Sequence, residues 1–125
     1  MVIKDIMKTK NYTVKVNDTI DGVLALMNKL HINGLPVIDE LNNLVGMVVK
    51  ADIYRFMTSP GHYDSCPVDW VMSKSVITVS PEEDILAAAK KLREKNIISM
   101  PVVEEGKVIG IISIEDLLDY FSTRD

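Results

Sequence analysis

The spacing of apolar residues predicts a short strand and then a helix near the start of the chain. Residues 13–16 are rich in β-branched side chains, which is typical of a strand. Asp18 or Thr19 can cap a helix that begins directly afterwards. Apolar residues then recur at three- and four-residue steps, at Ile20, Val23, Leu24, Met27 and Leu30. The run 23–27 is apolar around most of the helix, so we expect it to face a partner surface, most simply that of a second copy.

Two further strands and a second helix follow in the same half of the chain. Residues 35–38 and 44–49 are apolar and flank a polar turn, a pattern that predicts a hairpin. The next segment places Ile53 and Phe56 on one helical face. The predicted order of elements is therefore β-α-β-β-α.

The second half of the chain repeats this order. Residues 67–121 align with residues 2–57 at an offset of 65. After one extra residue in the first hairpin turn the offset becomes 64, and Asp52 then aligns with Asp116. In the second copy we expect the first strand at residues 76–79. We expect its helix to start at Ser80, with Pro81 in the first helical position and acidic residues in the first turn, namely Glu82, Glu83 and Asp84.

The duplication sets the expected domain organisation. Repeat 1 spans residues 1–57, a turn-rich linker spans 58–66, and repeat 2 spans 67–125. A single repeat would leave one face and one edge of its sheet uncovered. We therefore expect an α/β fold of the α+β type, in which tandem β-α-β-β-α repeats pack sheet to sheet with pseudo-two-fold symmetry as one integrated module.

Composition and charge narrow the range of functions. The 18 acidic residues exceed the 14 basic ones and no Lys/Arg block is present, so nucleic-acid binding is disfavoured. Cys66 is the only cysteine, which excludes an internal disulfide and a cysteine-based metal cage. A charged N-terminal segment and the lack of a long apolar run predict neither a signal peptide nor a membrane span, and we expect a cytoplasmic protein. The sequence contains no recognisable catalytic arrangement, so we expect no enzyme.

Ordered motifs that occur twice give the chain a family resemblance. Each copy has an Ile/Val-Met leader, then Gly34-Leu35-Pro36-Val37 or Ser99-Met100-Pro101-Val102, and finally a glycine six residues before Asp52 or Asp116. This set resembles a CBS domain pair, also called a Bateman module. The resemblance implies two clefts between the repeats that commonly take AMP, ADP, ATP or S-adenosylmethionine, and frequent dimerisation of the pair.

The resemblance also implies which residues line each cleft. One cleft would be built from Thr13, Ile32, Gly34, Leu35, Pro36, Ile111, Ser113 and Asp116. The reciprocal cleft would be built from Ile77, Thr78, Ile98, Ser99, Met100, Pro101, Met47, Val49 and Asp52. Val49 stands where the family has a hydroxyl, so we expect the reciprocal cleft to bind more weakly or to stay empty.

The chemistry of these residues suits an adenine ligand. A carboxylate such as Asp116 can accept hydrogen bonds from both vicinal hydroxyls of a ribose. Ser113-x-x-Asp116 is also close to a capping box, which would merely satisfy the free amides at the start of a helix, and this alternative stays open. Asp52 favours the ligand interpretation, because it is retained where Val49 cannot cap. An acidic residue in the first turn also suits the helix dipole, so a structural role for Asp52 stays open as well. Few basic residues could reach phosphates, which favours AMP or an adenosyl ligand over ATP; the candidates are Lys10, Lys50 and Lys74.

Two functions follow from this pattern. The first is a stand-alone regulatory module, without a required cofactor, in which an adenine nucleotide or adenosyl ligand shifts the geometry of the repeats or of a homodimer. An effector protein, which the sequence does not identify, would respond to that shift. The alternative is a ligand-free scaffold for dimerisation and protein interaction.

Overall fold

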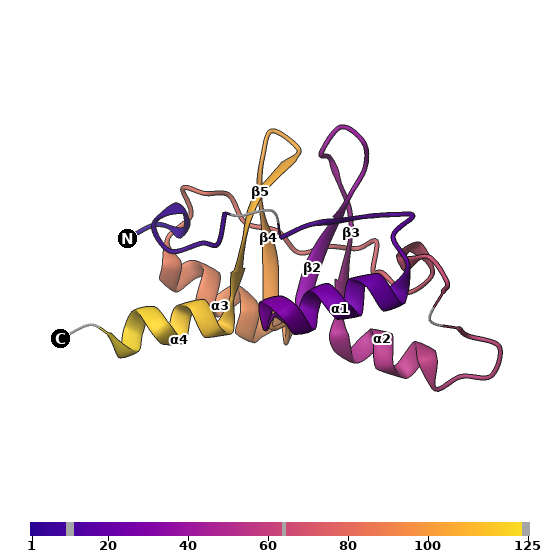
Figure 1. Ribbon diagram of the computed structural model, residues 1–125. Coiled ribbons are helices and arrows are strands. Elements are labelled where there is room, and N and C mark those ends of the chain that lie inside the picture. The colour runs from indigo at the N-terminus through magenta and orange to yellow at the C-terminus, as the bar shows by residue number, and fades with distance from the viewer. Residues whose placement is uncertain (10–11, 64, 124–125) are drawn as a thin grey trace. The chain divides into compact units, whose positions relative to one another are not determined.

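The computed structural model describes residues 1–9, 12–63 and 65–123 (Figure 1). Its fold is a mixed α+β fold, as the sequence predicts. In chain order the strands and α-helices are β1 (Val14–Lys15), α1 (Ile20–Leu30), β2 (Gly34–Ile38), β3 (Leu44–Val49), α2 (Lys50–Met57), α3 (Ile85–Lys95), β4 (Ser99–Glu104), β5 (Lys107–Ser113) and α4 (Ile114–Ser122). Two single-turn 3₁₀ helices, η1 (Ile3–Asp5) and η2 (Val68–Trp70), lie in the two leaders.

The chain forms two compact units, and each contains the leader of the other repeat. Unit 1 comprises residues 1–12 and 77–125, and unit 2 comprises residues 13–76. In unit 1, Ile3 from the N-terminal leader is fully buried in the same core as α3, β4, β5 and α4. The compact units therefore do not coincide with the sequence repeats.

Unit 2 is built on a three-stranded sheet in the order β1-β2-β3. β1 pairs with β2 in parallel, and β2 pairs with β3 antiparallel, with Gly34 opposite Val49. Every residue of β2 is buried, and the buried residues of α1 are Ile20, Val23 and Met27. The apolar spacing of the sequence thus marks the buried face of α1.

Unit 1 is built on the antiparallel hairpin β4-β5, with Ser99 opposite Ser113. Its core consists of Ile3, Val79, Ile85, Ala88, Leu92, Met100, Val102, Ile112 and Leu117. The hairpin ends where α4 begins, so Ser113 is both the last residue of β5 and the N-cap of α4.

The strand predicted at residues 76–79 is wrong, because this segment forms only a single parallel bridge between Val79 and Val102. The two bonds of that bridge run from Val79 N to Pro101 O at 3.2 Å and from Val103 N to Val79 O at 2.9 Å. The next rung of a parallel ladder would require the N–H of residue 81, which is a proline and has none. The second repeat is therefore α-β-β-α with a bridge in place of its first strand.

The predicted helix start at Ser80 and Pro81 is also wrong, because α3 begins at Ile85 and its N-cap is Asp84. The Asp84 carboxylate accepts hydrogen bonds from Leu86 N at 3.0 Å and Ala87 N at 3.3 Å. The leader prevents an earlier start, since Lys4 N donates to Pro81 O at 3.0 Å and thereby occupies a carbonyl that an additional helical turn would use.

Both leaders approach the hairpins at a glycine. An ideal Cβ on Gly110 would lie 2.7 Å from Lys8 O and 2.8 Å from the sulfur of Met7. A Cβ on Gly46 would lie 2.6 Å from the sulfur of Met72. The paired glycines of the two repeats therefore allow the leaders to pack closely on β5 and β3.

Within the described ranges, no helix has the length and apolar character needed to cross a membrane.

Candidate functional site

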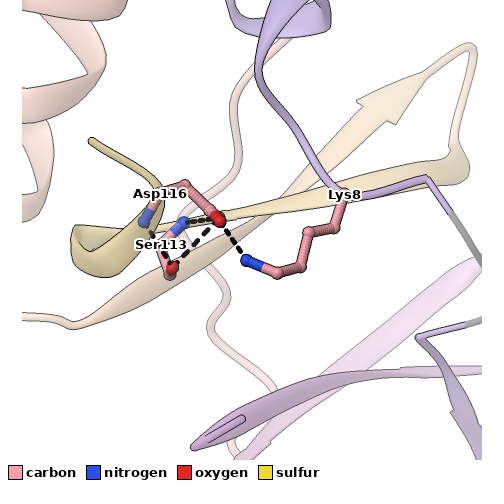
Figure 2. A network of polar contacts seen from close by, with 3 residues as sticks. All are labelled: Lys8, Ser113 and Asp116. Carbon is pink, nitrogen blue, oxygen red and sulfur yellow. Dashed lines mark hydrogen bonds and ion pairs between the residues drawn. The ribbon is translucent and has the colours of Figure 1, made fainter. Parts of the chain in front are cut away.

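The carboxylate of Asp116 lies buried in the first turn of α4 (Figure 2). Its Oδ2 accepts hydrogen bonds from Ser113 N at 2.8 Å and Ser113 Oγ at 3.0 Å. In return, Asp116 N donates to Ser113 Oγ at 3.2 Å. The capping box considered from the sequence is therefore present, and it fixes the carboxylate at the end of β5.

Lys8 supplies a positive charge to this carboxylate, and the motif pattern did not identify it. Its Nζ forms an ion pair with Asp116 Oδ1, as Figure 2 shows. The leader backbone positions Lys8, because Lys8 N and O bond to Ile111 O and N, both at 3.0 Å. The Asp116 side chain is 7% exposed and that of Lys8 is 36% exposed. Solvent can therefore reach the lysine while the carboxylate stays mostly buried.

The remaining acceptor capacity of Asp116 determines what the site can bind. A carboxylate offers about four lone-pair positions. Ser113 occupies two positions on Oδ2 and Lys8 occupies one on Oδ1. One external donor could bind without rearrangement, whereas two vicinal hydroxyls would compete with Lys8 for Oδ1. The lysine contact therefore has to move or share its acceptor when a diol binds.

The equivalent carboxylate in unit 2 has different partners. Asp52 lies in the first turn of α2 and forms an ion pair with Arg55 of the same helix. The N-cap of α2 is Val49, which makes no side-chain capping bond. The position aligned with Lys8 is Ser73, whose hydroxyl donates to Ser75 O at 3.3 Å. The two aspartates are thus related by sequence but not by environment.

Ser99 carries a buried hydroxyl that has no hydrogen-bond partner among the residues described. Leaving a buried hydroxyl unsatisfied costs roughly 1–3 kcal/mol. A ligand atom that hydrogen-bonds to Ser99 would remove that cost. Ser99 is one of the residues that the sequence predicts for the reciprocal cleft, the one expected to bind more weakly.

The other residues expected at the clefts are divided between the two units. In unit 1 the structure places Met100 and Pro101 beside Ser99 on β4, and Ile111 two residues before Ser113 on β5; Ile77 and Thr78 are half-buried and Ile98 is exposed. In unit 2, β2 holds Gly34, Leu35 and Pro36, β3 holds Met47 and Val49, and Thr13 and Ile32 are half-buried beside β1 and β2. Each predicted cleft therefore draws on residues of both units.

Of the three lysines that the sequence suggests for phosphate contact, the structure describes two, and their surroundings differ. Lys50 Nζ donates to Asn28 Oδ1 at 2.7 Å, and Lys74 is exposed. Lys10 lies outside the described residues. Lys8 is therefore the lysine that the structure places at a predicted site carboxylate.

Unit 1 also carries an open apolar groove of about 440 Å³ between α3 and α4. Leu118 is 61% exposed and Phe121 is 41% exposed on this surface. Large apolar side chains that remain exposed in a cluster are typical of an interaction surface.

Among residues 1–9, 12–63 and 65–123, no three His, Cys, Asp or Glu side chains form a group that could hold a metal ion.

The chain belongs to the CBS domain family, since it matches the CBS domain over residues 3–59 and again over residues 68–123. It is 30% identical over 115 residues to the CBS domain-containing protein YhcV of Bacillus subtilis, a match that covers 92% of this chain and 81% of YhcV. It is 33% identical over 118 residues to a homoserine O-acetyltransferase of Methanococcus vannielii, covering 93% of this chain. The chain spans only 24% of that enzyme's length.

Solved structures of CBS domain pairs have the same fold. The CBS domain pair of protein MJ0100, in complex with 5′-methylthioadenosine and S-adenosyl-L-methionine, has a TM-score of 0.90 and 28% identity, covering 100% of this chain and 98% of that one. CBSX2 in complex with AMP has a TM-score of 0.84 and 26% identity, covering 97% of this chain and 96% of that one.

Proposed function

We propose that this chain is a regulatory module that binds an adenine nucleotide or an adenosyl ligand and carries out no reaction of its own. The observation that carries the proposal is the buried, fixed carboxylate of Asp116 at the start of α4. Such a group is suited to the vicinal hydroxyls of a ribose, because charge-assisted hydrogen bonds are roughly twice as strong as neutral ones. Ligands with that ribose occupy MJ0100 and CBSX2, which resemble the chain over nearly its whole length.

The proposed principal cleft combines Asp116 and Ser113 with the residues around Thr13 and Pro36. Apolar side chains such as Leu35 would cover the adenine ring, and backbone groups beside Thr13 would read its rim. The reciprocal cleft would centre on Asp52 and Ser99. Ligand binding would shift the relative geometry of the repeats, and an effector protein would respond to that shift.

Titration calorimetry on the wild-type chain tests the binding proposal. AMP, 5′-methylthioadenosine and S-adenosylmethionine are titrated separately, with GMP as a control for the base. We expect saturable binding of at least one adenine ligand, with about one site of higher affinity per chain. At a ligand concentration of about 100 Kd, the same ligand should stabilise the fold by roughly 2.7 kcal/mol. The absence of both binding and stabilisation with all three ligands would reject the proposal.

We also propose that the chain forms a homodimer through the groove between α3 and α4. α3 has a net positive charge, because its acidic residue Glu94 is outnumbered by Lys90, Lys91, Arg93 and Lys95, whereas the charged residues of α4 are all acidic, namely Glu115, Asp116 and Asp119. In a two-fold contact the same surface meets itself, so α3 of one copy can face α4 of the other with complementary charges. This groove is also the observation that favours the alternative function, a ligand-free scaffold.

Sedimentation velocity tests the dimer independently of any ligand. We expect about twice the chain mass of 14.0 kDa for the wild type. Leu118→Glu places a charge on the apolar lining of the groove and should shift the chain towards the monomer, while Leu41→Glu, at an exposed hairpin turn, should not. A monomeric wild type, or a dimer unaffected by Leu118→Glu, would reject this interface. A dimer that binds no adenine ligand would favour the scaffold.

A further inference from the structure

We propose that Lys8 makes the Asp116 site selective for adenine ligands with an anionic group near the ribose, namely nucleoside phosphates, over neutral or cationic adenosyl ligands. This inference rests on the proposed function, because it concerns which ligand the same carboxylate takes. It identifies Lys8 as a specificity-determining residue supplied by the N-terminal leader.

The first step is the fixed position of the lysine. Two backbone hydrogen bonds between Lys8 and Ile111, both 3.0 Å long, attach the leader to β5 next to the last residues of the strand. The close approach is possible because residue 110 is glycine. The backbone of Lys8 is therefore held close to Asp116, whereas the four-carbon stem that carries the ammonium group can still turn.

The second step is the effect of a bound ribose on the ion pair. Lys8 occupies Asp116 Oδ1, and two ribose hydroxyls would need that oxygen. A diol therefore competes with Lys8 for the carboxylate. The lysine side chain is 36% exposed and can turn away from Asp116 without leaving the site. The displaced ammonium then needs a new acceptor, and the 5′-phosphate of a nucleotide, one sugar away from the hydroxyls, provides one.

The third step is the balance of charge. Without Lys8, a phosphate would lie beside the uncompensated charge of Asp116, on a helix that carries two further carboxylates, those of Glu115 and Asp119. Lys8 cancels the charge of Asp116 and gains a phosphate partner. Neutral 5′-methylthioadenosine offers no such partner to the displaced lysine. In S-adenosylmethionine the group on the 5′ carbon is a sulfonium, which would repel the lysine, and the carboxylate of the methionine part lies further from the ribose than a 5′-phosphate does.

The position aligned with Lys8 in the other repeat supports this role. Ser73 makes the corresponding backbone bonds to Met47, at 2.8 and 2.9 Å, but has no charge. The backbone attachment of the leader therefore does not require a lysine. The positive charge of Lys8 therefore serves the Asp116 carboxylate and is not needed to attach the leader.

Binding constants of three ligands on four proteins test the proposal. The ligands are AMP, neutral 5′-methylthioadenosine and cationic S-adenosylmethionine. The proteins are the wild type, Lys8→Met, Lys8→Arg and Lys4→Met. Lys4 is the matched control, since it lies in the same leader and pairs with Glu82 at 3.0 Å, a hydrogen bond that raises the pKa of Lys4.

In the wild type we expect AMP to bind about tenfold more tightly than 5′-methylthioadenosine, the effect of one hydrogen bond to a charged group. Lys8→Met should weaken AMP binding by about tenfold and leave or increase the affinity for the other two ligands. Lys8→Arg should keep the AMP preference, and Lys4→Met should behave like the wild type.

The outcomes separate this inference from the proposed function. If no ligand binds to the wild type, the proposed function fails and the role of Lys8 fails with it. If ligands bind but Lys8→Met leaves AMP affinity unchanged, or weakens all three ligands equally, only the role of Lys8 is overturned. Equal melting temperatures of Lys8→Met and the wild type exclude misfolding as the cause of an altered preference.

Discussion

Asp116→Asn is expected to weaken adenine-ligand binding by about 10- to 100-fold, because hydrogen bonds to a charged group contribute roughly 1.5–3 kcal/mol. Asparagine keeps the size of the side chain and an oxygen that can still accept from Ser113 N, so the start of α4 should be preserved. It loses the negative charge and one of the two acceptor oxygens, which are the properties a ribose diol requires. Calorimetric titration of the variant and of the wild type with the same ligand measures the difference.

Asp52→Asn is the matched control for this variant. Asp52 occupies the aligned position but pairs with Arg55 and lacks the serine and lysine partners of Asp116. We expect Asp52→Asn to change the affinity of the principal site by less than about threefold, since Asp52 is not among the residues proposed to line that site. Equal losses in the two variants, or a larger loss in Asp52→Asn, would contradict the assignment of the principal site to Asp116.

Gly110→Ala is expected to destabilise the fold by about 1–3 kcal/mol and to lower the melting temperature by roughly 5 to 15 °C. The added Cβ would lie 2.7 Å from the carbonyl oxygen of Lys8. That oxygen accepts a hydrogen bond from Ile111 N, and Lys8 N donates to Ile111 O, so the backbone here cannot move aside as a side chain can. Because this leader also carries Lys8, the variant should lose ligand selectivity together with stability. Thermal unfolding monitored by circular dichroism measures the first effect.

Gly22→Ala provides the control for that variant. Gly22 lies inside α1, and its added Cβ would make only an ordinary contact of 3.4 Å with Thr19 Oγ1. In a helix, alanine is more stable than glycine by up to about 1 kcal/mol, so this substitution should leave the melting temperature unchanged or raise it. If Gly110→Ala were as stable as Gly22→Ala, the leader would not pack on β5 as described.

The apolar spacing of the sequence was sufficient to predict most of the elements. Helices and hairpins are set by local patterns, so the two strands of each hairpin and the closing helices α2 and α4 occur where the pattern indicates. The repeat made these assignments stronger, because each pattern appears twice at an offset of 65 or 64. The local capping box of Ser113 and Asp116 was readable for the same reason.

Pro81 is involved in both of the elements that the sequence predicts wrongly. The second copy of the first strand shrinks to one bridge because Pro81 cannot donate the next hydrogen bond. The start of α3 moves from Ser80 to Ile85 because the N-terminal leader bonds to the carbonyl of Pro81. A contact between residues about 80 positions apart leaves no mark in local periodicity.

Lys8 was missed for a related reason. It lies 108 positions from Asp116 in sequence, and the leader that carries it packs with the other repeat. One signal was available in the alignment of the two copies, where the charged Lys8 aligns with the uncharged Ser73. Differences between aligned repeats can therefore point to functional asymmetry as usefully as their shared motifs point to the fold.

The central claim is that an adenine ligand binds through the carboxylate of Asp116, and a crystal structure of the chain with AMP tests it most directly. We expect AMP to be bound with both ribose hydroxyls donating to Asp116 and with Lys8 Nζ moved from that carboxylate to the phosphate. AMP bound with its ribose at Asp52, or crystals grown in saturating AMP that contain no nucleotide, would contradict the account.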